Sequence, residues 1–312
     1  MSEQQHAAGD RAGPLVLIAN PAAGKGRGAR ALAAVEQTLR AAGVAYEVRQ
    51  TGGPGEGTRL AAAATREGVE TLVTVGGDGS FHEVLAGVLA EAPRETPTLG
   101  LIPVGTGNDY ARMLGLSGDD PAGAARTLLE GRVRAVDVGR LEGGDAGPEH
   151  FCNNVGLAFM AAANAAHERA RFLPGRLSYS LGGVASFLAY RAERLEVWVD
   201  DVALEGRFLI VHIAIGRYCG GGICLTPGAD IDAGEFHVCL LPERSKVKAM
   251  LQWSRIAAGE RVGDMEILTG TRVRVHGARG FLIHADGEVR RVPTGVLEAT
   301  LRPKLLRVRS AI

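Results

Sequence analysis

Cysteine, lysine and long apolar runs are scarce in this sequence, and each shortage argues against a class of protein. Four cysteines in 312 residues show neither a disulfide framework nor zinc-binding spacing, so we expect reduced thiols and a cytoplasmic protein. No run reaches the ~18 apolar residues that a transmembrane helix needs. The N-terminus as far as Gly13 is polar and lacks the apolar core of a secretory signal, so we interpret it as a disordered leader.

Charge of one sign is not in excess either. Basic and acidic side chains number 35 each, which argues against a nucleic-acid partner because nucleic-acid-binding proteins usually carry a basic surplus. Only four of the basic residues are lysines, so an anion-binding surface would consist mostly of arginine. The hydrophobic fraction of 46% is enough for folded cores, and the length suggests two domains.

The hydrophobic pattern changes partway along the chain. Roughly the first 130 residues alternate short apolar runs with helical patterns, which predicts a parallel sheet with crossover helices. After that, short alternating strands with helical insertions predict an antiparallel β domain. The expected strands are Leu15–Ala19, Val44–Val48, Val69–Val75, Thr98–Ile102, Val133–Leu141, Leu195–Val199, Phe208–Ile215, Phe236–Leu241, Arg272–His276 and Val296–Leu301. The helical insertions run through Leu177, Leu181, Val184 and Leu188, and through Val247, Met250 and Leu251.

Glycine-rich turns follow three expected strands of the first part. They are Asn20–Gly28, Gly76–Ser80 and Pro103–Asp109. Ligands of an open parallel sheet bind at the carboxyl ends of its strands, and glycine lets backbone N–H groups approach phosphate oxygens closely. None of these turns fits a Walker phosphate loop or the Gly-x-Gly-x-x-Gly dinucleotide motif. The turns predict a phosphate site outside those two classes.

The second turn opens an expected helix. Ser80 and Glu83 have the spacing of a capping box, and an apolar face follows them. A plain strand–turn–helix joint, with Asp78 as a turn former, would explain two of the glycines but explains Gly-Gly-Asp-Gly poorly. We interpret the turn as a phosphate- and metal-binding element.

A set of short stretches carries a family resemblance. They are Asn20–Gly26, Gly76–Val84, Pro103–Arg112, Gly220–Gly222 and Asp286–Glu288. In these stretches, and in their order, the sequence resembles the diacylglycerol kinase catalytic-domain family of lipid kinases, in its soluble bacterial branch. The resemblance implies an α/β plus β fold, with an N-terminal Rossmann-like (NAD-kinase-like) parallel-sheet domain and a C-terminal antiparallel β-sandwich domain with helical insertions. We expect the first domain to span 1–135, completed by 298–312, and the second 136–297.

Carried over by position, the resemblance also implies ATP and Mg²⁺ as cofactors. The first turn would contact phosphates and the second would cradle them, while Thr51 and Thr106 would lie near the nucleotide. The residues implied in nucleotide binding are Asn20, Pro21, Gly24, Lys25, Gly26, Thr51, Gly76, Gly77, Asp78, Gly79, Ser80, Glu83, Gly105, Thr106, Asn108 and Asp109.

The Asp-Gly-Glu stretch bears on the chemistry. Phosphoryl transfer to a hydroxyl needs a carboxylate that accepts the hydroxyl proton. Asp286 lies between an apolar and a charged strand, and from the residues alone a plain Asp-Gly hairpin turn explains it equally well. The resemblance implies that Asp286 is the general base, with Glu288 as a supporting carboxylate and Asp78 as a residue that orients the Mg²⁺–phosphate network.

A second acidic turn contains Asp230 and Asp232. Some members of the family bind a structural Mg²⁺ near this position, but Ala233 stands where they often have aspartate. Two interpretations of this turn stay open: a structural Mg²⁺ site at Asp230 and Asp232, or an exposed turn. We prefer the exposed turn.

The implied substrate is a diacylglycerol-like lipid, whose phosphorylation belongs to phospholipid biosynthesis. Sphingoid bases, ceramides and polyprenols would leave similar traces in the sequence, so the identity of the lipid stays open. The protein would then contact a membrane surface transiently, and Phe172 and Leu173, flanked by arginines, are one candidate for that contact. A loop between helices explains the same segment. The sequence also leaves a homodimer open.

Two rival functions remain. A kinase of a soluble acceptor such as NAD would use the same scaffold, although the third turn and the Asn20-Pro21 start disfavour it. A nucleotide-binding regulator without catalysis is also open, although Asp78, Asp286 and Glu288 are all present.

Overall fold

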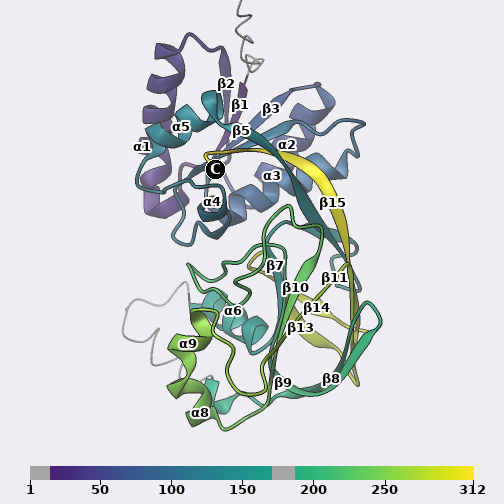
Figure 1. Ribbon diagram of the computed structural model, residues 1–312. Coiled ribbons are helices and arrows are strands. Elements are labelled where there is room, and N and C mark those ends of the chain that lie inside the picture. Colours follow the sequence, from purple (N-terminus) through teal and green to yellow (C-terminus); the bar gives the residue numbers. More distant parts are fainter. Residues whose placement is uncertain (1–14, 171–186) are drawn as a thin grey trace, which may run out of the picture. The chain divides into compact units, whose positions relative to one another are not determined.

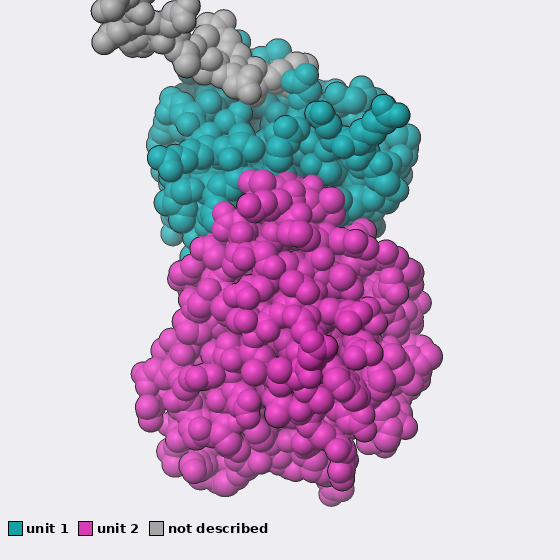
Figure 2. All heavy atoms as spheres, turned by 45° about the vertical axis from the view of Figure 1, so that its right-hand side comes forward, with its two compact units in different colours: residues 1–134, 307–312 teal, residues 135–306 magenta. Residues whose placement is uncertain are grey.

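The computed structural model describes residues 15–170 and 187–312, and the chain divides into two compact units. Figure 1 shows their elements and Figure 2 colours the units separately. Unit 1 comprises the chain up to Arg134 together with Arg307–Ile312, and unit 2 comprises Ala135–Leu306. The predicted N-terminal leader and the greater part of the helix predicted from Leu177 to Leu188 lie outside the described residues.

Unit 1 is a parallel sheet between two layers of helices. Its strands are β1 (Leu15–Ala19), β2 (Tyr46–Gln50), β3 (Thr71–Gly76) and β4 (Thr98–Pro103), joined by the end of β15 (Val296–Ser310). The strand order is β15-β4-β3-β1-β2, and all of these pairs are parallel. The helices are α1 (Ala23–Ala41), α2 (Glu56–Arg66), α3 (Asp78–Ala90), α4 (Asp109–Met113) and α5 (Pro121–Glu130).

The core of this sheet explains its apolar runs. Every residue of β1 and β3 is buried, because helices cover both faces of the sheet and leave no polar side to the strands. Helices α1 and α5 pack together on one face and α2 and α3 on the other (Figure 1). Leu32, Val35 and Leu39 of α1 enter the core, at the helical spacing seen in the sequence.

Two local predictions for unit 1 need correction. The second strand lies at Tyr46–Gln50 rather than Val44–Val48. Helix α3 begins at Asp78, and neither Ser80 nor another side chain caps it. The capping box does not form because Glu83 accepts hydrogen bonds from the backbone of a different loop, that which precedes α2.

Unit 2 is an antiparallel β structure with helical insertions, as predicted. Its strands are β5 (Arg132–Glu142), β6 (Glu149–Phe151), β7 (Asn154–Ala158), β8 (Glu193–Val199), β9 (Val202–Ala214), β10 (Phe236–Pro242), β11 (Glu266–Gly270), β12 (Arg272–Gly277), β13 (Phe281–Ala285), β14 (Glu288–Val292) and the first part of β15. The order is β14-β13-β7-β9-β8-β12-β15, and β10 pairs with β9 and β11. The helices are α6 (Phe159–Ala170), α8 (Lys246–Leu251) and α9 (Trp253–Ala257).

The two faces of the central strands of unit 2 enter different cores. Alternate residues of β7, β9, β10 and β13, such as Val155, Val211, Val238 and Ile283, enter a large core within the β structure. Residues of the opposite face, such as Ile210, enter a second core with Ala249 of α8 and Ile256 of α9, or lie under α6. This alternation is the period of two expected of strands.

The last residues of the chain complete unit 1. Val308 of β15 pairs with Leu99 of β4, and Arg309 Nη1 donates to the carbonyl of Gly131 at 2.8 Å. The N–H of Ala311 donates to the carbonyl of Leu114 at 2.9 Å. The C-terminal residues are therefore a structural part of the first unit.

Two histidines are buried on the helix-covered face of the unit 2 sheet. His212 of β9 is fully buried and His284 of β13 is 4% exposed. Burial lowers the pKa of His212 to about 3, with a further contribution from His284. Burial also lowers the pKa of His284 to about 4, against an opposing effect of the Asp286 charge. Both rings are neutral in the folded protein at physiological pH.

The free energy of unfolding should fall as the pH falls from about 6.5 toward 4. The unfolded histidines bind protons near their usual pKa of about 6.5, whereas the folded ones do not. At pH 5 the expected loss is about 2 kcal/mol for each histidine. Denaturant titrations at pH 7 and pH 5 measure this loss, which His212→Gln and His284→Gln should each reduce. An unchanged pH dependence in both variants would contradict the prediction.

Candidate active site

The three glycine-rich turns lie together at one edge of the unit 1 sheet. Ala19 at the end of β1 pairs with Val75 of β3, and Gly76 of β3 pairs with Pro103 at the end of β4. Because the strands are parallel and in register, the turns that follow them leave the sheet side by side. The prediction that these turns cluster is met within this unit.

Glycine is required where the second and third turns meet. A Cβ atom on Gly105 would lie 2.7 Å from the Cα atom of Gly77, and one on Gly77 would lie 2.9 Å from the Cα atom of Gly105. Real Cβ atoms do not approach backbone this closely, so the two backbones pack directly against each other. In the first turn, a Cβ on Gly24 would lie 2.0 Å from the carbonyl oxygen of Val104.

The first turn has an unusual backbone at its centre. Gly24, Lys25 and Gly26 have φ values of 58°, 61° and 86°, so regular helix α1 begins only after them. For Lys25 this left-handed conformation costs about 1 kcal/mol or more. A Cβ on Gly26 would have nothing within 4 Å, so the turn is open on that side and backbone groups there are accessible to a ligand.

Arg27 joins the first and third turns, and the sequence analysis missed it. Its Nη2 atom donates to the carbonyls of Val104 at 3.2 Å and Gly105 at 3.1 Å, while Nε donates to the carbonyl of Gly24 at 3.3 Å. The only sequence signal was an arginine between two glycines. The guanidinium fixes both turns through carbonyl oxygens.

Two polar side chains predicted for nucleotide binding also link turns to one another. Asn20 Nδ2 donates to Ser80 Oγ at 3.2 Å, joining the first and second turns, and Asn20 Oδ1 accepts from the N–H of Ala22 at 3.1 Å. Thr51 follows β2, where its N–H donates to the carbonyl of Ala19 at 2.9 Å. Thr51 is thus held next to the start of the first turn.

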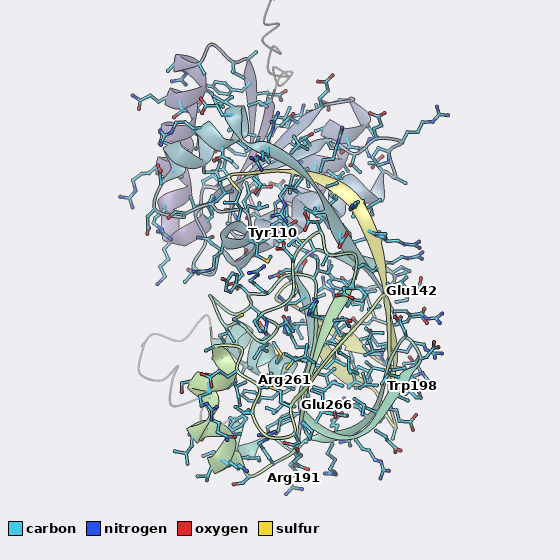
Figure 3. All side chains as sticks on the ribbon, in the orientation of Figure 1. Tyr110, Glu142, Arg191, Trp198, Arg261 and Glu266 are labelled. Atoms are coloured by element: carbon cyan, nitrogen blue, oxygen red, sulfur yellow. The ribbon has the colours of Figure 1, made fainter. Side chains whose placement is uncertain are left out.

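Asp78 connects the second turn to α4. Its carboxylate accepts from the N–H groups of Asp109 at 3.3 Å and Tyr110 at 3.2 Å, and a carboxylate is favoured at the positive end of a helix. The Tyr110 ring, labelled in Figure 3, stacks on Phe81 of α3 with 4.8 Å between centroids. Asn108 takes a left-handed φ of 51° and donates from Nδ2 to the carbonyl of Gly105 at 3.0 Å.

The remaining predicted nucleotide residues fall into two groups. Glu83 points to the loop before α2 and accepts from the N–H groups of Gly55 and Gly57, both at 2.9 Å. Lys25, Gly26, Gly79 and Thr106 are exposed on the turns, and Pro21 is half-buried. The result is a cradle of backbone with few side chains at its open side, which suits a polyphosphate bound by N–H groups. The suitability for a polyphosphate therefore rests on backbone N–H groups rather than on side chains.

Asp286 occupies the turn of a tight hairpin in unit 2. It and Gly287 form the two-residue connection between β13 and β14, with φ values of 46° and 93°, as in the hairpin turns that favour Asp-Gly. The hairpin reading of this stretch is therefore confirmed. A position in a hairpin turn is compatible with a catalytic role, because the side chain of Asp286 points away from the turn toward another segment.

That segment is Cys152–Asn154, whose importance the sequence did not reveal. Asp286 Oδ2 accepts from the N–H of Cys152 at 2.8 Å and faces its Sγ atom at 3.4 Å. Asp286 Oδ1 accepts from the N–H groups of Asn153 and Asn154, both at 2.9 Å. These three backbone donors fix the position of the Asp286 carboxyl group.

Glu288 has a different environment from Asp286. Its side chain is 51% exposed and forms a 3.8 Å ion pair with Arg290 on the same strand. Its role as a supporting carboxylate remains a prediction.

The acidic turn at Asp230 and Asp232 is held by an ion pair and by a buried aspartate. Asp230 Oδ2 accepts from Arg217 Nη2 at 3.0 Å. The fully buried Asp137, which the sequence analysis missed, accepts from the N–H groups of Gly234 at 2.7 Å and Lys304 at 2.8 Å. Among the described residues, no three His, Cys, Asp or Glu side chains come together as a metal site would require. The structural Mg²⁺ site therefore remains a prediction.

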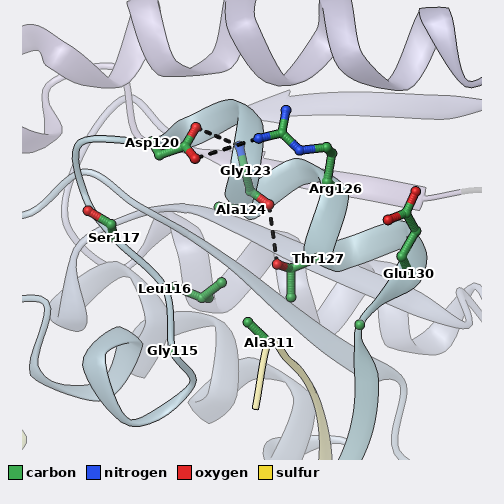
Figure 4. Close-up of a pocket in the computed structure, with 11 residues that line it drawn as sticks. Gly115, Leu116, Ser117, Asp120, Gly123, Ala124, Arg126, Thr127, Glu130 and Ala311 are labelled. Carbon is green, nitrogen blue, oxygen red and sulfur yellow. Dashed lines mark hydrogen bonds and ion pairs between the residues drawn. The ribbon is translucent and has the colours of Figure 1, made fainter.

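A pocket of about 440 Å³ lies elsewhere in unit 1, beside α5 (Figure 4). Asp120 borders it, accepts from the N–H of Gly123 at 2.7 Å and lies 3.6 Å from Arg126 Nη2. Thr127 and Ala311 also line it. None of the residues predicted to bind the nucleotide lines this pocket.

The chain is similar to known proteins over most of its length. Residues 14–141 match the family described as diacylglycerol kinase catalytic domain, and residues 153–310 match the YegS C-terminal NAD kinase beta sandwich-like domain. The protein named diacylglycerol kinase of Bacillus subtilis (strain 168) is 28% identical over 276 residues, covering 87% of this chain and 88% of that protein. A protein of Pseudomonas aeruginosa named "Probable lipid kinase YegS-like" is 32% identical over 268 residues, covering 85% of each.

The fold has solved counterparts. A crystal structure of a diacylglycerol kinase from Bacillus anthracis str. Sterne covers 97% of this chain and 98% of its own, with a TM-score of 0.74 and 19% identity. The predicted fold class, a Rossmann-like parallel sheet followed by an antiparallel β-sandwich, is confirmed. The chain belongs to the family of lipid kinases that carry the diacylglycerol kinase catalytic domain.

Proposed function

We propose that this lipid kinase transfers the γ-phosphoryl group of ATP to the free hydroxyl of a diacylglycerol-like lipid. The observation that carries the proposal is the convergence of three turns at the carboxyl ends of β1, β3 and β4, where Gly77 and Gly105 touch through their Cα atoms. The backbone approach there excludes side chains and leaves N–H groups for phosphate oxygens. Relatives over most of this length carry the names diacylglycerol kinase and lipid kinase.

In this proposal the residues of unit 1 bind and orient the nucleotide. The first and second turns hold phosphates, Arg27 keeps the first and third turns together, and Asp78 fixes the third turn by binding the start of α4. Thr51 and Thr106 lie near the nucleotide. Mg²⁺ bound with ATP would neutralise charge on the phosphate oxygens, and Asp78 is the residue that would orient it.

Asp286 is the proposed general base. Its carboxyl group is held in place by the backbone of Cys152–Asn154, and it would accept the proton of the acceptor hydroxyl as the new P–O bond forms and the bond from the γ-phosphorus to ADP breaks. Glu288 adds negative charge to the same turn. A phosphorylated lipid and ADP are the products.

Replacing Gly105 with alanine tests the backbone cradle. The new Cβ would lie 2.7 Å from Gly77 Cα and 2.9 Å from Asn108 Oδ1, so the two turns must separate. We expect the affinity for ATP to fall at least about tenfold, or 1.4 kcal/mol, in a calorimetric titration. Gly53→Ala is the matched control, because its Cβ would have nothing within 4 Å. Equal ATP affinities in both variants would contradict the cradle.

Replacing Asp286 with asparagine tests the general base. We expect turnover of diacylglycerol in mixed micelles, followed with labelled ATP, to fall about 10²–10⁴-fold while ATP affinity stays within a few-fold. Asp286→Glu should retain part of the activity, because a carboxylate remains. The exposed Asp201→Asn serves as a control for the substitution itself. Full turnover in Asp286→Asn, with unchanged thermal stability, would refute the role.

We also propose transient contact with a membrane surface, the environment of the lipid. Phe172 and Leu173, the sequence candidates for this contact, lie outside the described residues. Among the residues that the structure describes, no helix is long and apolar enough to cross a bilayer. Support comes instead from α8 and the start of α9, where Leu251 is 79%, Val247 63% and Trp253 41% exposed.

The charges around these exposed residues suit an anionic bilayer. Lys246, Lys248 and Arg255 are basic, and no acidic residue occurs from 245 to 259. Tryptophan and lysine together favour the interface between lipid and water. Apolar tips with basic neighbours are the composition of surfaces that insert shallowly.

The double substitution Val247→Ser and Leu251→Ser should lower binding to vesicles that contain anionic lipid by about tenfold. Vesicle sedimentation measures this, and turnover of a short-chain, dispersed acceptor should stay unchanged. Val202→Ser removes a side chain of comparable exposure, 51%, from β9 and should have no effect on vesicle binding. Undiminished binding of the double variant would place the membrane contact elsewhere.

A further inference from the structure

Two buried histidines and a glycine form one row across the unit 2 sheet. His212 of β9 pairs directly with Gly156 of β7, and Gly156 pairs directly with His284 of β13. Directly paired residues of antiparallel strands share a face. The helix α6 packs on these three strands, so the row lies on the helix-covered face.

Glycine is required in the middle of this row. A Cβ atom on Gly156 would lie 2.1 Å from His284 Nε2, so the imidazole of His284 lies across the backbone of Gly156, on the side of His212. Each neutral imidazole offers one N–H donor and one acceptor nitrogen. The row therefore presents two donors and two acceptors on one small area.

Among the residues that the structure describes, none of these ring nitrogens has a hydrogen-bond partner. Both nitrogens of His212 and both of His284 are buried without a hydrogen bond. The same holds for the side-chain oxygens of Asn153 and Asn154, whose residues are 7% and 4% exposed. More than about nine-tenths of buried polar groups in proteins are paired, so this concentration indicates a polar partner that the described residues do not supply.

The row has a carboxylate on one side and an apolar core on the other. Asp286 follows His284 by two residues, and Asn154 precedes Gly156 by two on the same face. In the opposite direction, Ile210 precedes His212 by two and enters the apolar core beneath α8 and α9. Successive rows of a face are about 7 Å apart.

This order of surfaces matches the order of parts in an esterified glycerol. The free hydroxyl would lie at Asp286, the ester groups at the histidine row, and the hydrocarbon chains at the apolar core. Neutral imidazoles and amides suit an uncharged ester carbonyl, because they supply hydrogen bonds without net charge. A phosphate or an ammonium group would find no counter-charge from these four side chains.

We propose that His212 and His284, together with Asn153 and Asn154, bind the uncharged ester linkage of the lipid acceptor and make the enzyme selective for ester-linked lipids. This inference rests on the proposed function. It adds the residues that recognise the acceptor, where the proposed function names only those that hold the nucleotide and remove the proton.

The test compares a diacylglycerol with the dialkylglycerol that carries ether linkages. Both have the same hydroxyl and chains, but the diether lacks the carbonyl oxygens. The wild-type enzyme should favour the diester at least about tenfold in kcat/KM. His284→Leu and His212→Leu should lose most of that preference by slowing the diester about tenfold and the diether less than about threefold. His284→Gln, which keeps a donor and an acceptor, should restore part of it.

His276→Leu is the matched control. His276 lies on β12 beside Trp198, with 4.7 Å between ring centroids, and should leave the diester preference unchanged. A wild-type preference below twofold would overturn the inference whether or not the variants fold. An equal fall of kcat/KM for the diester and the diether in the leucine variants would also overturn the inference. Buried water or a purely structural role would then explain the histidine row. Transfer by the wild type to neither lipid would refute the proposed function itself, together with this inference.

Discussion

The hydrogen bonds from three backbone N–H groups to Asp286 are the constraint on which this part of unit 2 depends. They tie the β13–β14 hairpin to the segment Cys152–Asn154, which leads into β7. The pairing of β7 with β13, which brings Gly156 opposite His284, lies directly beside that tie. Asp286 thereby joins the hairpin turn to the neighbouring strand.

The glycine-rich turns of unit 1 are held together by direct contact between their backbones. Gly77 and Gly105 allow two turns to touch, and two acidic side chains predicted to take part in nucleotide binding also organise the chain. Asp78 binds the start of α4, and Glu83 binds the loop before α2. In the proposed function, a polyphosphate would be bound mainly by backbone N–H groups of turns that Asp78 and Glu83 hold in place. Such a surface recognises the geometry of phosphates and makes little demand on side chains.

The sequence predicts the parts of this structure that depend on local pattern. The apolar runs that form β1 and β4 and the glycine-rich turns after them could be located, because burial and turn chemistry leave traces in neighbouring residues. The contacts of Asp286 could not, since its partners are more than 130 residues away and only strand register brings them together. The contacts of Arg27 and Asp137 could not be predicted either, because their partners are also distant in the sequence. The capping box failed because a more distant loop competes for Glu83.

The path of β15 has a consequence for how the protein forms. Its final residues fill a place in the first unit beside β4 and Leu114, although most of that unit lies at the start of the sequence. During synthesis the sheet of unit 1 must therefore wait, with one edge of β4 unpaired, until unit 2 has left the ribosome. An unpaired strand edge invites association with other chains. Nascent chains that stall late should thus be captured by chaperones at the first unit, even though nearly all of its residues have been made.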